Sequence, residues 1–365
     1  MKRRKFLTGA AAAGVAGAAA STFPTPAISQ GKTQWIAVSA FGKAGLLGRA
    51  LEKYSKFVTS ASGGRLTLKA YHSGELVSGF GQMEAVQSGT AQMGYGAPYY
   101  WAGLSDAVSF VAAMPYGLNA QEQNAWFYKG GGQEIADEVY KELGTKFLPM
   151  GNTGNQMGGW YNKEVKSEAD LKGLKFRMPG LGGEILSTFG VNVVNLPGPQ
   201  VQPALTSGAI DGTEWIGPVA DLGFGLYKVC KYYYYPGWHE PATVLDGFFD
   251  IKAWEKLDSE LKDIVTTGAA ATNVELLSQF QALNNAAMGK LVNEHKVNVK
   301  NYGEPLLKAI GERAAEVLGA RAAKNALAKE TFNALIKFRR SMVSWNNYSE
   351  SAFAKARQYA DFKEV

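Results

Sequence analysis

The sequence contains few of the residues on which disulfide-stabilised proteins and many enzymes depend. Among 365 residues there is a single cysteine, Cys230, so the chain cannot form an internal disulfide. The three histidines, His72, His239 and His295, lie in unrelated contexts and show no metal-ligand spacing. No Gly-x-Ser-x-Gly motif is present, and the glycines at 130–132 lack the Lys-Ser/Thr of a phosphate-binding loop. These absences favour a protein without a catalytic centre, whose stability comes from its hydrophobic core.

Basic residues are concentrated at the N-terminus, where the first 29 residues have the pattern of a cleaved export signal. Residues 1–7 combine adjacent arginines with a following Phe-Leu, residues 8–20 are rich in Ala and Gly, and a small-x-small cleavage pattern ends at Ser29. The arginine pair favours the twin-arginine route over the general secretory route, and thus a periplasmic location. A basic amphipathic arm and an uncleaved signal anchor are the alternatives, although the apolar stretch is short for a membrane span.

Removal of this signal leaves a chain that is nearly neutral. The whole sequence has a formal net charge of +6 at pH 7, and residues 1–29 contain four basic residues and no acidic one. The remaining chain therefore has a net charge of +2. No basic block is interleaved with aromatic residues, so a nucleic-acid partner is not indicated.

Short strands and helices alternate along the first half of the remaining chain. Apolar residues alternate at period two in segments such as 65–71 and recur every three to four residues in segments such as 45–60. A second strand–helix series begins at residue 166, and from residue 253 the pattern is almost entirely helical. This rhythm predicts an α/β protein. The expected strands are 33–39, 65–71, 93–96 and 146–150, and the expected helices are 45–60, 80–88 and 134–143.

The last helical stretch, residues 329–363, carries many aromatic side chains, among them Trp345, Tyr348, Phe353 and Tyr359. Aromatic residues at helical spacing usually belong to the core, but a terminal helix this rich in them can also dock on a second subunit. Both interpretations stay open, and the second predicts a homodimer.

Two Trp- and Gly-rich polar stretches in the middle of the chain have the composition of a ligand site. The first, GNTGNQMGGW at residues 151–160, is followed by LKFRMPG at 174–180. The second, LTSGAIDGTEWIGP at residues 205–218, is followed by GWHEP at 237–241. Together they supply a guanidinium, two carboxylates, amides and aromatic side chains. This set suits the binding of a small carboxylate, with or without a metal ion, better than catalysis.

On these motifs the sequence resembles the solute-binding proteins of tripartite ATP-independent periplasmic (TRAP) transporters, the DctP-like family. DLKGLKFR at residues 170–177 is typical of the whole family, whereas GNTGNQMGGW at 151–160 and HEP at 239–241 are typical of the branch that binds 2-oxo acids. The similarity covers nearly the whole length after the signal. It implies two α/β domains around a ligand cleft, joined by strands and one long helix, with a helical C-terminus.

The resemblance also implies a division of the chain. A twin-arginine-type signal peptide at 1–29 would precede domain I, made of residues 30–150 plus about 240–275. Domain II would consist of residues 151–239 plus about 276–340, and residues 341–365 would form a C-terminal helix that can be exchanged between the subunits of a homodimer.

Arg177 is the residue that we expect to anchor the carboxylate of the ligand. It ends a predicted strand ahead of a Met-Pro-Gly break, and α/β sheets present their ligand contacts at the carboxyl ends of strands. A guanidinium pairs with a carboxylate through two parallel hydrogen bonds and stays charged when water is removed. The resemblance implies the same role, and a surface salt bridge is the alternative.

Glu214 lies in the second polar stretch, where it would repel an anionic ligand unless a positive charge lay between them. A hard cation can bridge the two, because such ions take carboxylate, amide and backbone oxygens. The resemblance implies Na⁺ or Ca²⁺, held by Gln156, Glu214, the Trp215 carbonyl and Glu240. With Arg177 and a bound monoanion, Na⁺ would leave a net charge of −1 and Ca²⁺ would leave none. If Glu240 is only structural, Na⁺ alone balances the charge.

The remaining predicted ligand contacts are aromatic and amide side chains. Tyr100 and Trp215 can form apolar walls, and a Tyr hydroxyl can donate to a keto or hydroxyl oxygen. Asn152 is a further hydrogen-bond partner. The predicted substrate-binding residues are therefore Gln156, Arg177, Trp215, Tyr100 and Asn152.

The sequence therefore predicts a periplasmic receptor that captures a small 2-oxo monocarboxylate such as pyruvate by domain closure and delivers it to membrane permease subunits. A receptor for 2-hydroxy acids such as lactate, with calcium as the bridge, is one alternative, and a receptor for sugar acids or dicarboxylates is another. A secreted metal-dependent enzyme acting on the same carboxylates is the third. It would need an acid or base beside the ligand, and the sequence shows no obvious one.

Overall fold

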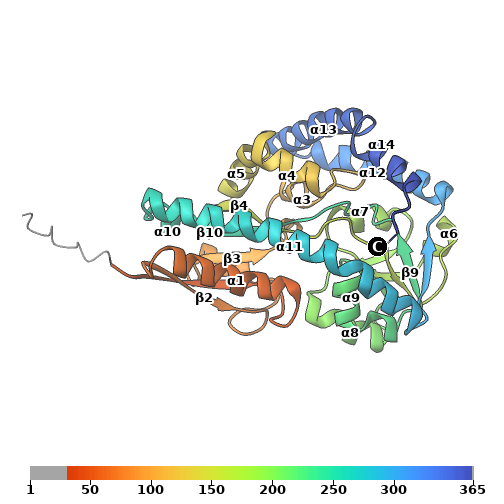
Figure 1. Cartoon of the computed structure of the whole chain (residues 1–365), viewed down its shortest axis with the longest axis horizontal. Coiled ribbons are helices and arrows are strands. Elements are labelled where there is room, and N and C mark those ends of the chain that lie inside the picture. Colours follow the sequence, from red (N-terminus) through yellow and green to blue (C-terminus); the bar gives the residue numbers. More distant parts are fainter. Residues whose placement is uncertain (1–30, 364–365) are drawn as a thin grey trace, which may run out of the picture. The chain divides into compact units, whose positions relative to one another are not determined.

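The computed structural model describes residues 31–363, which fold around two β-sheets (Figure 1). The predicted export signal falls in residues 1–30, outside the described residues, as do residues 364 and 365. Within the described range, no helix has both the length and the hydropathy needed to cross a membrane.

The first sheet contains the strands that the alternating segments predict. In sheet order they are β2 (Leu66–Tyr71), β1 (Thr33–Ser39), β3 (Met93–Gly96), β10 (Val244–Asp250) and β4 (Thr145–Asn152). β1 pairs in parallel with β2 and β3, whereas β10 lies antiparallel between β3 and β4. The chain thus returns to the first sheet through β10, after the other strands of the second sheet and before its last strand, β11 (Asn298–Asn301).

The helices among the strands of the first sheet include the three predicted ones and three further ones. They are α1 (Leu46–Ala61), α2 (Gln82–Gln87), η1 (Pro98–Trp101), α3 (Val108–Ala112), α4 (Ala120–Lys129) and α5 (Gly132–Glu142). α1, α2 and α5 agree with the predicted helices within two residues. α4 is the longest of the helices that the periodicity does not predict, because its aromatic residues are consecutive, at positions 126–128, and do not recur every three to four residues.

The start of α4 is nevertheless marked in the sequence. Asn119 Oδ1 accepts a hydrogen bond from the Glu122 N–H at 3.0 Å, and Glu122 Oε2 accepts one from the Asn119 N–H at 2.8 Å. This reciprocal capping box satisfies two free N–H groups of the first turn. Between α4 and α5, Gly131 has φ of +84°, a left-handed conformation that favours glycine.

The second sheet carries the polar stretches. In sheet order its strands are β11 (Asn298–Asn301), β9 (Tyr232–Tyr235), β5 (Gly159–Tyr161), β8 (Gly212–Thr213), β6 (Lys175–Arg177) and β7 (Asn192–Val194). β6 pairs in parallel with both β7 and β8, so their carboxyl ends meet at one edge. Its helices are α6 (Glu168–Leu171), α7 (Gly180–Ser187), α8 (Gly198–Thr206), α9 (Pro218–Phe224) and η2 (Leu226–Lys228).

One long helix runs past both sheets. After α10 (Ile251–Glu255), α11 (Ser259–Asn293) extends over 35 residues and packs against α1 and β4 and also against α9 (Figure 1). Asp258 caps its start by accepting a hydrogen bond from the Leu261 N–H at 2.8 Å. The helix joins elements of the first and second sheets in one rigid rod, as the family resemblance implies.

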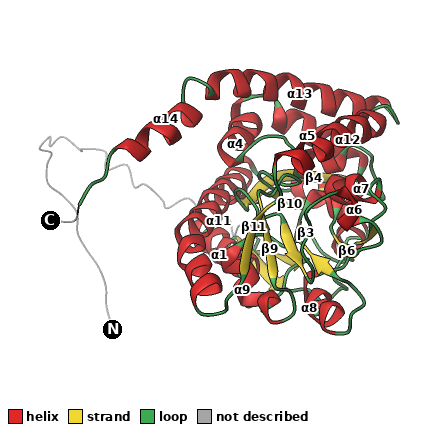
Figure 2. Cartoon of the chain, turned by 90° about the vertical axis from the view of Figure 1, so that its right-hand side faces the viewer, coloured by secondary structure: helices red, strands yellow, loops and turns green. Residues whose placement is uncertain are grey.

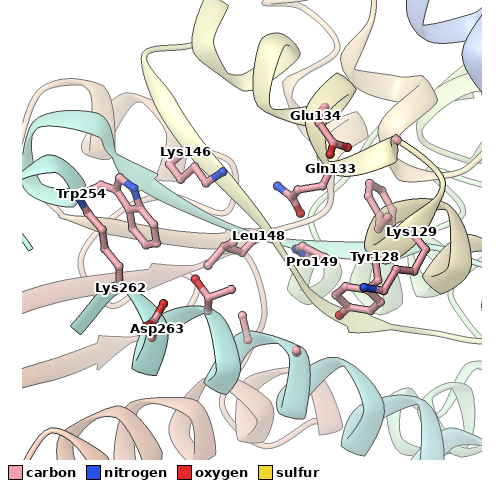
Figure 3. A pocket seen from close by; sticks show the side chains of 15 residues that line it. Tyr128, Lys129, Gln133, Glu134, Lys146, Leu148, Pro149, Trp254, Lys262 and Asp263 are labelled. Carbon is pink, nitrogen blue, oxygen red and sulfur yellow. The ribbon is translucent and has the colours of Figure 1, made fainter. Parts of the chain in front are cut away.

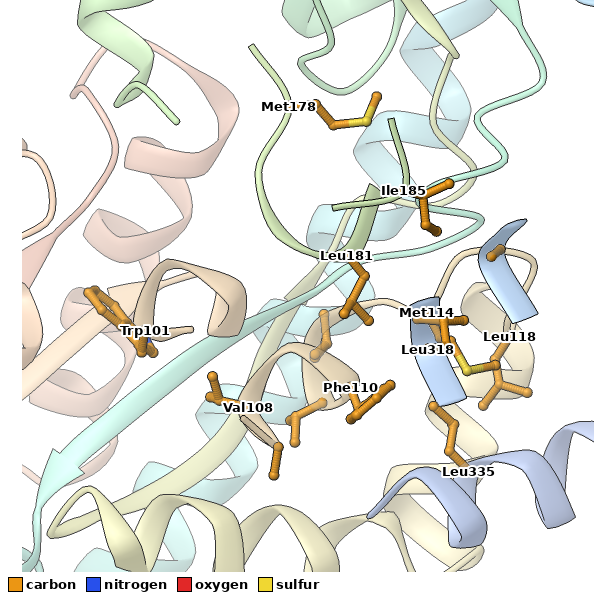
Figure 4. Close-up of a cluster of buried hydrophobic side chains, with 14 of the residues drawn as sticks. Trp101, Val108, Phe110, Met114, Leu118, Met178, Leu181, Ile185, Leu318 and Leu335 are labelled. Atoms are coloured by element: carbon orange, nitrogen blue, oxygen red, sulfur yellow. The ribbon is translucent and has the colours of Figure 1, made fainter. Parts of the chain in front are cut away.

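The hydrophobic core continues from the first sheet into the C-terminal helices. Phe110 and Met114 near α3, Leu181 on α7, and Leu318 and Leu335 lie in one buried cluster (Figure 4). Leu318 belongs to α12 (Glu304–Ala322) and Leu335 to α13 (Ala326–Asn346). Burying each such side chain contributes about 1.5–3 kcal/mol to folding.

The position of α13 bears on the predicted division into domains. α13 packs against α12 and also against α3, α4 and α5, which all belong to residues 30–150, whereas the prediction groups residues up to about 340 with domain II. Its buried residues, Ala328, Thr331 and Leu335, repeat every three to four positions, so one side of the helix is buried. We therefore propose to group α13 with domain I; the other predicted boundaries stay a prediction.

The chain ends in α14 (Glu350–Ala356) and η3 (Arg357–Tyr359). α14 extends away from the helices that surround the sheets (Figure 2). Every residue from 350 to 363 is exposed.

Candidate functional site

Polar side chains from four segments meet in one buried cluster. Gln156 follows β4, Arg177 ends β6, Glu214 follows β8, and His239 and Glu240 lie between β9 and β10. These five residues, here named the polar cluster, are each at most 5% exposed. Burying two acids and a base together is unfavourable unless they pair or bind something. The cluster is therefore the first candidate for a functional site.

The Arg177 side chain is oriented by two backbone carbonyls and by the ring of a tryptophan. Its Nε donates to the Leu196 carbonyl and its Nη1 to the Glu214 carbonyl, both at 3.2 Å. Nη1 also pairs with the Glu214 carboxylate, and the guanidinium lies 5.1 Å from the centre of the Trp215 ring. Since these contacts use Nε and Nη1, the Nη2 edge is the part of the guanidinium best placed to receive a carboxylate.

Glu214 and His239 face each other inside the polar cluster. Glu214 Oε2 lies 3.6 Å from His239 Nε2, and neither atom has a hydrogen-bond partner in residues 31–363. Burial raises the pKa of Glu214 to about 7, and the Arg177 charge opposes this rise. Burial lowers the pKa of His239 to about 4, so the imidazole is neutral at pH 7.

Gln156 and Glu240 form the other half of the polar cluster. Gln156 Nε2 donates to Glu240 Oε2 at 2.7 Å and to the hydroxyls of Thr153 and Thr243 at 3.2 Å each. Glu240 Oε2 also accepts from the Thr243 hydroxyl and, at 3.4 Å, from the Tyr99 hydroxyl. These contacts assign the amide orientation, and Gln156 Oε1 has no donor among the described residues. Burial raises the pKa of Glu240 to about 7, with a further contribution from the neighbouring carboxylate.

Trp215, the residue after Glu214, has a backbone carbonyl that could serve as a further ligand oxygen. The carbonyls of Glu214, Ile216 and Gly217 all accept hydrogen bonds. Among the hydrogen bonds of the described residues, none ends on the Trp215 carbonyl. A backbone oxygen that stays without a donor in so buried a loop is available to a ligand or an ion.

The donor set fits a hard cation. Ligand atoms of Glu214, His239 and Glu240 lie within 4.8 Å of one another. Gln156 Oε1 adds a neutral oxygen, and buried acceptors without donors are rare unless an ion or ligand satisfies them. A site rich in oxygen suits Na⁺ or Ca²⁺.

His239 is the member of the polar cluster that the sequence analysis does not select. Histidine spacing is the wrong signal here, because the partners of His239 are carboxylates and not other histidines. Its position directly before Glu240, in the HEP segment, is the signal that could have identified it.

A small cavity borders the polar cluster, and the predicted walls line it. Tyr100, Gln156, Arg177 and Trp215 are all part of its lining, together with Tyr99 and Thr153. The cavity adjoins an apolar groove of about 540 Å³, with which it shares four lining residues: Phe41, Leu47, Trp215 and Ile216.

Asn152 lies outside this cavity. Its Nδ2 donates to Gln123 Oε1 at 2.8 Å, and its Oδ1 accepts from the Gly154 N–H at 2.9 Å. Both ends of the amide are therefore used in shaping the turn after β4. The structure does not bring Asn152 together with the other predicted ligand contacts.

A larger pocket, of about 620 Å³, opens between β4, α4, α5, α10 and α11 (Figure 3). Lys146 in this pocket pairs with Asp137 at 2.5 Å, and Gln133 donates to the Phe147 carbonyl at 3.0 Å. None of its lining residues is among the buried polar groups without a partner in residues 31–363. Size alone does not mark it as the ligand site, since its polar groups are exposed or paired.

Comparison with known proteins identifies the family of the chain. Residues 40–325 match the model of the family of bacterial extracellular solute-binding proteins, family 7 (DctP). The chain is 37% identical over 359 residues to a monocarboxylate 2-oxoacid-binding periplasmic protein of Nostoc sp., with 97% of this chain and 98% of that protein covered.

Two crystal structures of TRAP periplasmic solute-binding proteins share the fold. One, from Colwellia psychrerythraea with bound calcium and pyruvate, is 36% identical, has a TM-score of 0.86, and covers 89% of this chain and 99% of its own. The other, from Pseudoalteromonas atlantica with bound sodium and pyruvate, is 35% identical with the same TM-score and the same coverage.

These structures confirm the predicted two-domain α/β fold with a helical C-terminus. The family model spans most of the described chain, and the identities extend over nearly its whole length. The chain therefore belongs to family 7 of the bacterial extracellular solute-binding proteins, the DctP family of TRAP solute receptors.

Proposed function

We propose that this protein is a periplasmic TRAP receptor that binds a small 2-oxo monocarboxylate such as pyruvate together with a bridging cation. Arg177 would pair with the ligand carboxylate, and Tyr100 and Trp215 would line the ligand. Gln156, Glu214, the Trp215 carbonyl and Glu240 would hold the cation, which would supply a positive charge to a second ligand oxygen.

The observation that carries the proposal is the set of buried acceptors without donors next to a buried arginine. Gln156 Oε1 and Glu214 Oε2 have no partner within the described residues, and the cavity beside them is lined by Arg177 and Trp215. A cation would satisfy the acceptors that have no donor, and a ligand carboxylate would pair with the arginine. The pyruvate complexes of the two TRAP relatives, with calcium in one and sodium in the other, support the same pairing.

Charge balance favours a divalent ion. With His239 neutral, the polar cluster has one positive and two negative groups when both carboxylates are ionised. A bound monoanion increases the buried negative charge, which Na⁺ offsets in part and Ca²⁺ offsets fully. Because buried net charge is unfavourable, we infer that Ca²⁺ supports tighter ligand binding than Na⁺ at equal concentration.

The relatives are solute-binding receptors, and we propose that this chain likewise releases its ligand unchanged to permease subunits. We also propose that residues 1–29 direct export by the twin-arginine route. A homodimer formed through the C-terminal helix completes the proposal, supported by the exposure of Tyr348, Phe353 and Tyr359.

Calorimetric titration tests the ligand and the ion together. Metal-stripped protein would be titrated with pyruvate, 2-oxobutyrate and lactate, each without added metal and with Na⁺ or Ca²⁺ restored. We expect binding of one 2-oxo acid per chain that requires the cation, and recovery of the acid unchanged. Weaker binding of lactate would separate oxo acids from hydroxy acids.

Arg177→Ala provides the matching variant. Loss of a buried, hydrogen-bonded charge partner lowers affinity by at least about 30-fold, so pyruvate binding should nearly vanish. Arg313→Ala is the control, because Arg313 pairs with Glu316 on the surface of α12 and should leave binding unchanged. Pyruvate binding that survives Arg177→Ala, or that needs no cation, would contradict the proposed site.

A further inference from the structure

Asp221 is a buried carboxylate that does not belong to the proposed ligand shell. It lies on α9 and is 1% exposed. Its Oδ1 accepts hydrogen bonds from the backbone N–H groups of Ile216 and Gly217, at 3.2 and 3.1 Å. Its Oδ2 accepts from Trp160 Nε1 at 2.8 Å and from the Tyr233 hydroxyl at 2.7 Å. Each oxygen therefore carries two hydrogen bonds, the full capacity of a carboxylate.

The donors to Oδ2 are rigid parts of the second sheet. Trp160 is on β5 and Tyr233 is on β9, and these residues are directly opposite each other in the paired strands. Their rings stack with centroids 4.0 Å apart, and both side chains are fully buried. Asp221 is thus fixed to the sheet at one oxygen and holds the loop 214–217 at the other.

The loop 214–217 carries two of the proposed cation ligands. One is the Glu214 carboxylate, and the other is the Trp215 carbonyl, which no donor in the described residues contacts. The Trp215 carbonyl and the Ile216 N–H belong to the same planar trans peptide and point in opposite directions. The hydrogen bond that fixes this N–H on Asp221 therefore also fixes the direction of the carbonyl.

We propose that Asp221 is a positioning residue that directs the Trp215 carbonyl, and with it the loop that carries Glu214, at the cation. The inference rests on the proposed function, because it takes the cation site as given. Asparagine cannot replace the carboxylate, since its Nδ2 cannot accept a hydrogen bond and would face two donors. Partners in the outer shell of a metal site change metal affinity by about 10–100-fold when they are removed.

Asp246 offers a matched control elsewhere in the chain. It is fully buried on β10 of the first sheet, and its Oδ2 accepts from Trp101 Nε1 at 2.8 Å and from the Tyr140 hydroxyl at 2.5 Å. Its partners repeat the Trp–Tyr pair of Asp221, but they hold no part of the loop 214–217. Asn substitution at either aspartate removes a comparable buried carboxylate.

The experiment compares Asp221→Asn with Asp246→Asn and the wild type. Ca²⁺ affinity of the metal-stripped protein and pyruvate affinity at saturating Ca²⁺ would be measured by calorimetry, and the midpoint of thermal unfolding by calorimetric scanning. We expect Asp221→Asn to weaken Ca²⁺ binding by about 10-fold or more, as for other outer-shell partners of metals. Pyruvate affinity at saturating Ca²⁺ should change much less. Asp246→Asn should leave Ca²⁺ affinity within about 2-fold of the wild type, and the unfolding midpoints show how much each substitution destabilises the fold.

A milder pair of variants covers the case in which the asparagine variants do not fold. Tyr233→Phe removes one donor to Asp221, and Tyr140→Phe removes the equivalent donor to Asp246. Only Tyr233→Phe should then weaken Ca²⁺ binding. Unchanged Ca²⁺ affinity in the Asp221 variants, or equal weakening in both sets, overturns the positioning role while the receptor function stands. A wild type that binds neither Ca²⁺ nor pyruvate instead overturns the proposed function, and the inference with it.

Discussion

At the scale of single residues, the polar cluster holds two carboxylates in a place where both are costly to ionise. Glu214 has the Arg177 guanidinium as its partner, while Glu240 is held mainly by neutral donors, the Gln156 amide and the Thr243 hydroxyl. The charges do not cancel inside the cluster. A bound cation would therefore offset the net negative charge that the two ionised carboxylates leave in the cluster.

This imbalance predicts that the stability of the metal-free protein depends on pH. The pKa of both Glu214 and Glu240 is about 7 in the folded protein, against an ordinary value of 4.5. The folded state thus keeps protons that the unfolded state has released, so the stability contributed by these groups is complete below pH 4.5 and is lost as the pH rises through 7. We expect the metal-free protein to lose about 2–3 kcal/mol of stability per carboxylate, roughly 5 kcal/mol in all, between pH 5 and 8.

Denaturant unfolding at several pH values, with and without Ca²⁺, measures this loss. Ca²⁺ should remove most of it, because the ion stabilises the ionised carboxylates. Glu240→Gln, which cannot ionise, should show a smaller pH slope without metal than the wild type. Equal slopes for the two proteins would show that Glu240 is not the source.

The sequence could predict the role of a residue where few roles suit that residue type. An arginine at the end of a strand and acids in Gly-rich loops indicated an anion site with a cation, and the structure brings Gln156, Arg177, Glu214 and Glu240 together. Their ligand roles stay predictions until binding is measured. Asn152 is different, because the competing partner that occupies its amide, Gln123, is distant in sequence and visible only in the fold.

At the scale of helices and strands, the periodic segments were predictable and the connections between distant ones were not. Strands 33–39 and 93–96 coincide with β1 and β3, whereas the contact of α12 with both α7 and the segment before α3 has no local signal. Arg321 makes this contact. Its side chain is 8% exposed, and it donates to Glu184 on α7 at 2.5 Å and to the carbonyls of Asp106 and Ala102 at 3.1 and 3.2 Å.

Arg321→Ala should therefore destabilise the protein by about 2–3 kcal/mol, because it removes charge-assisted hydrogen bonds from a largely buried position. Arg313→Ala, on the same helix but with an exposed ion pair, should cost less than about 1 kcal/mol. Chemical denaturation of both variants measures the difference. If both variants lose the same small amount of unfolding free energy, the contacts of Arg321 are not what holds α12 in place.

At the scale of the whole molecule, the terminal aromatic residues separate into two groups. Phe332 packs against the core, whereas Tyr348 is 82% exposed, Tyr359 is 90% exposed and Phe362 is 92% exposed. The sequence could not assign them, because core and interface helices have the same spacing of aromatic residues. The exposed group favours contact with a second copy of the chain.

We expect the protein without its signal to have the mass of a dimer in solution. A variant that ends at Asn346, after α13, should be monomeric, because it lacks the exposed aromatic residues of α14 and η3. Light scattering at micromolar concentration measures both masses, and the truncated protein should keep its ligand affinity. A monomeric full-length protein would remove the dimer from the proposed function.

The pairing of Arg177 with Glu214 has a consequence for how the receptor responds to its surroundings. In the pair, each group already neutralises the other, so a carboxylate that arrives alone at the Nη2 edge meets a guanidinium whose charge Glu214 offsets. In the proposed mechanism, the cation attracts the Glu214 carboxylate, and the guanidinium charge becomes available to the ligand carboxylate. Ligand capture would then require both species: the receptor would bind the carboxylate only where the cation is also present, and neither one alone would be enough.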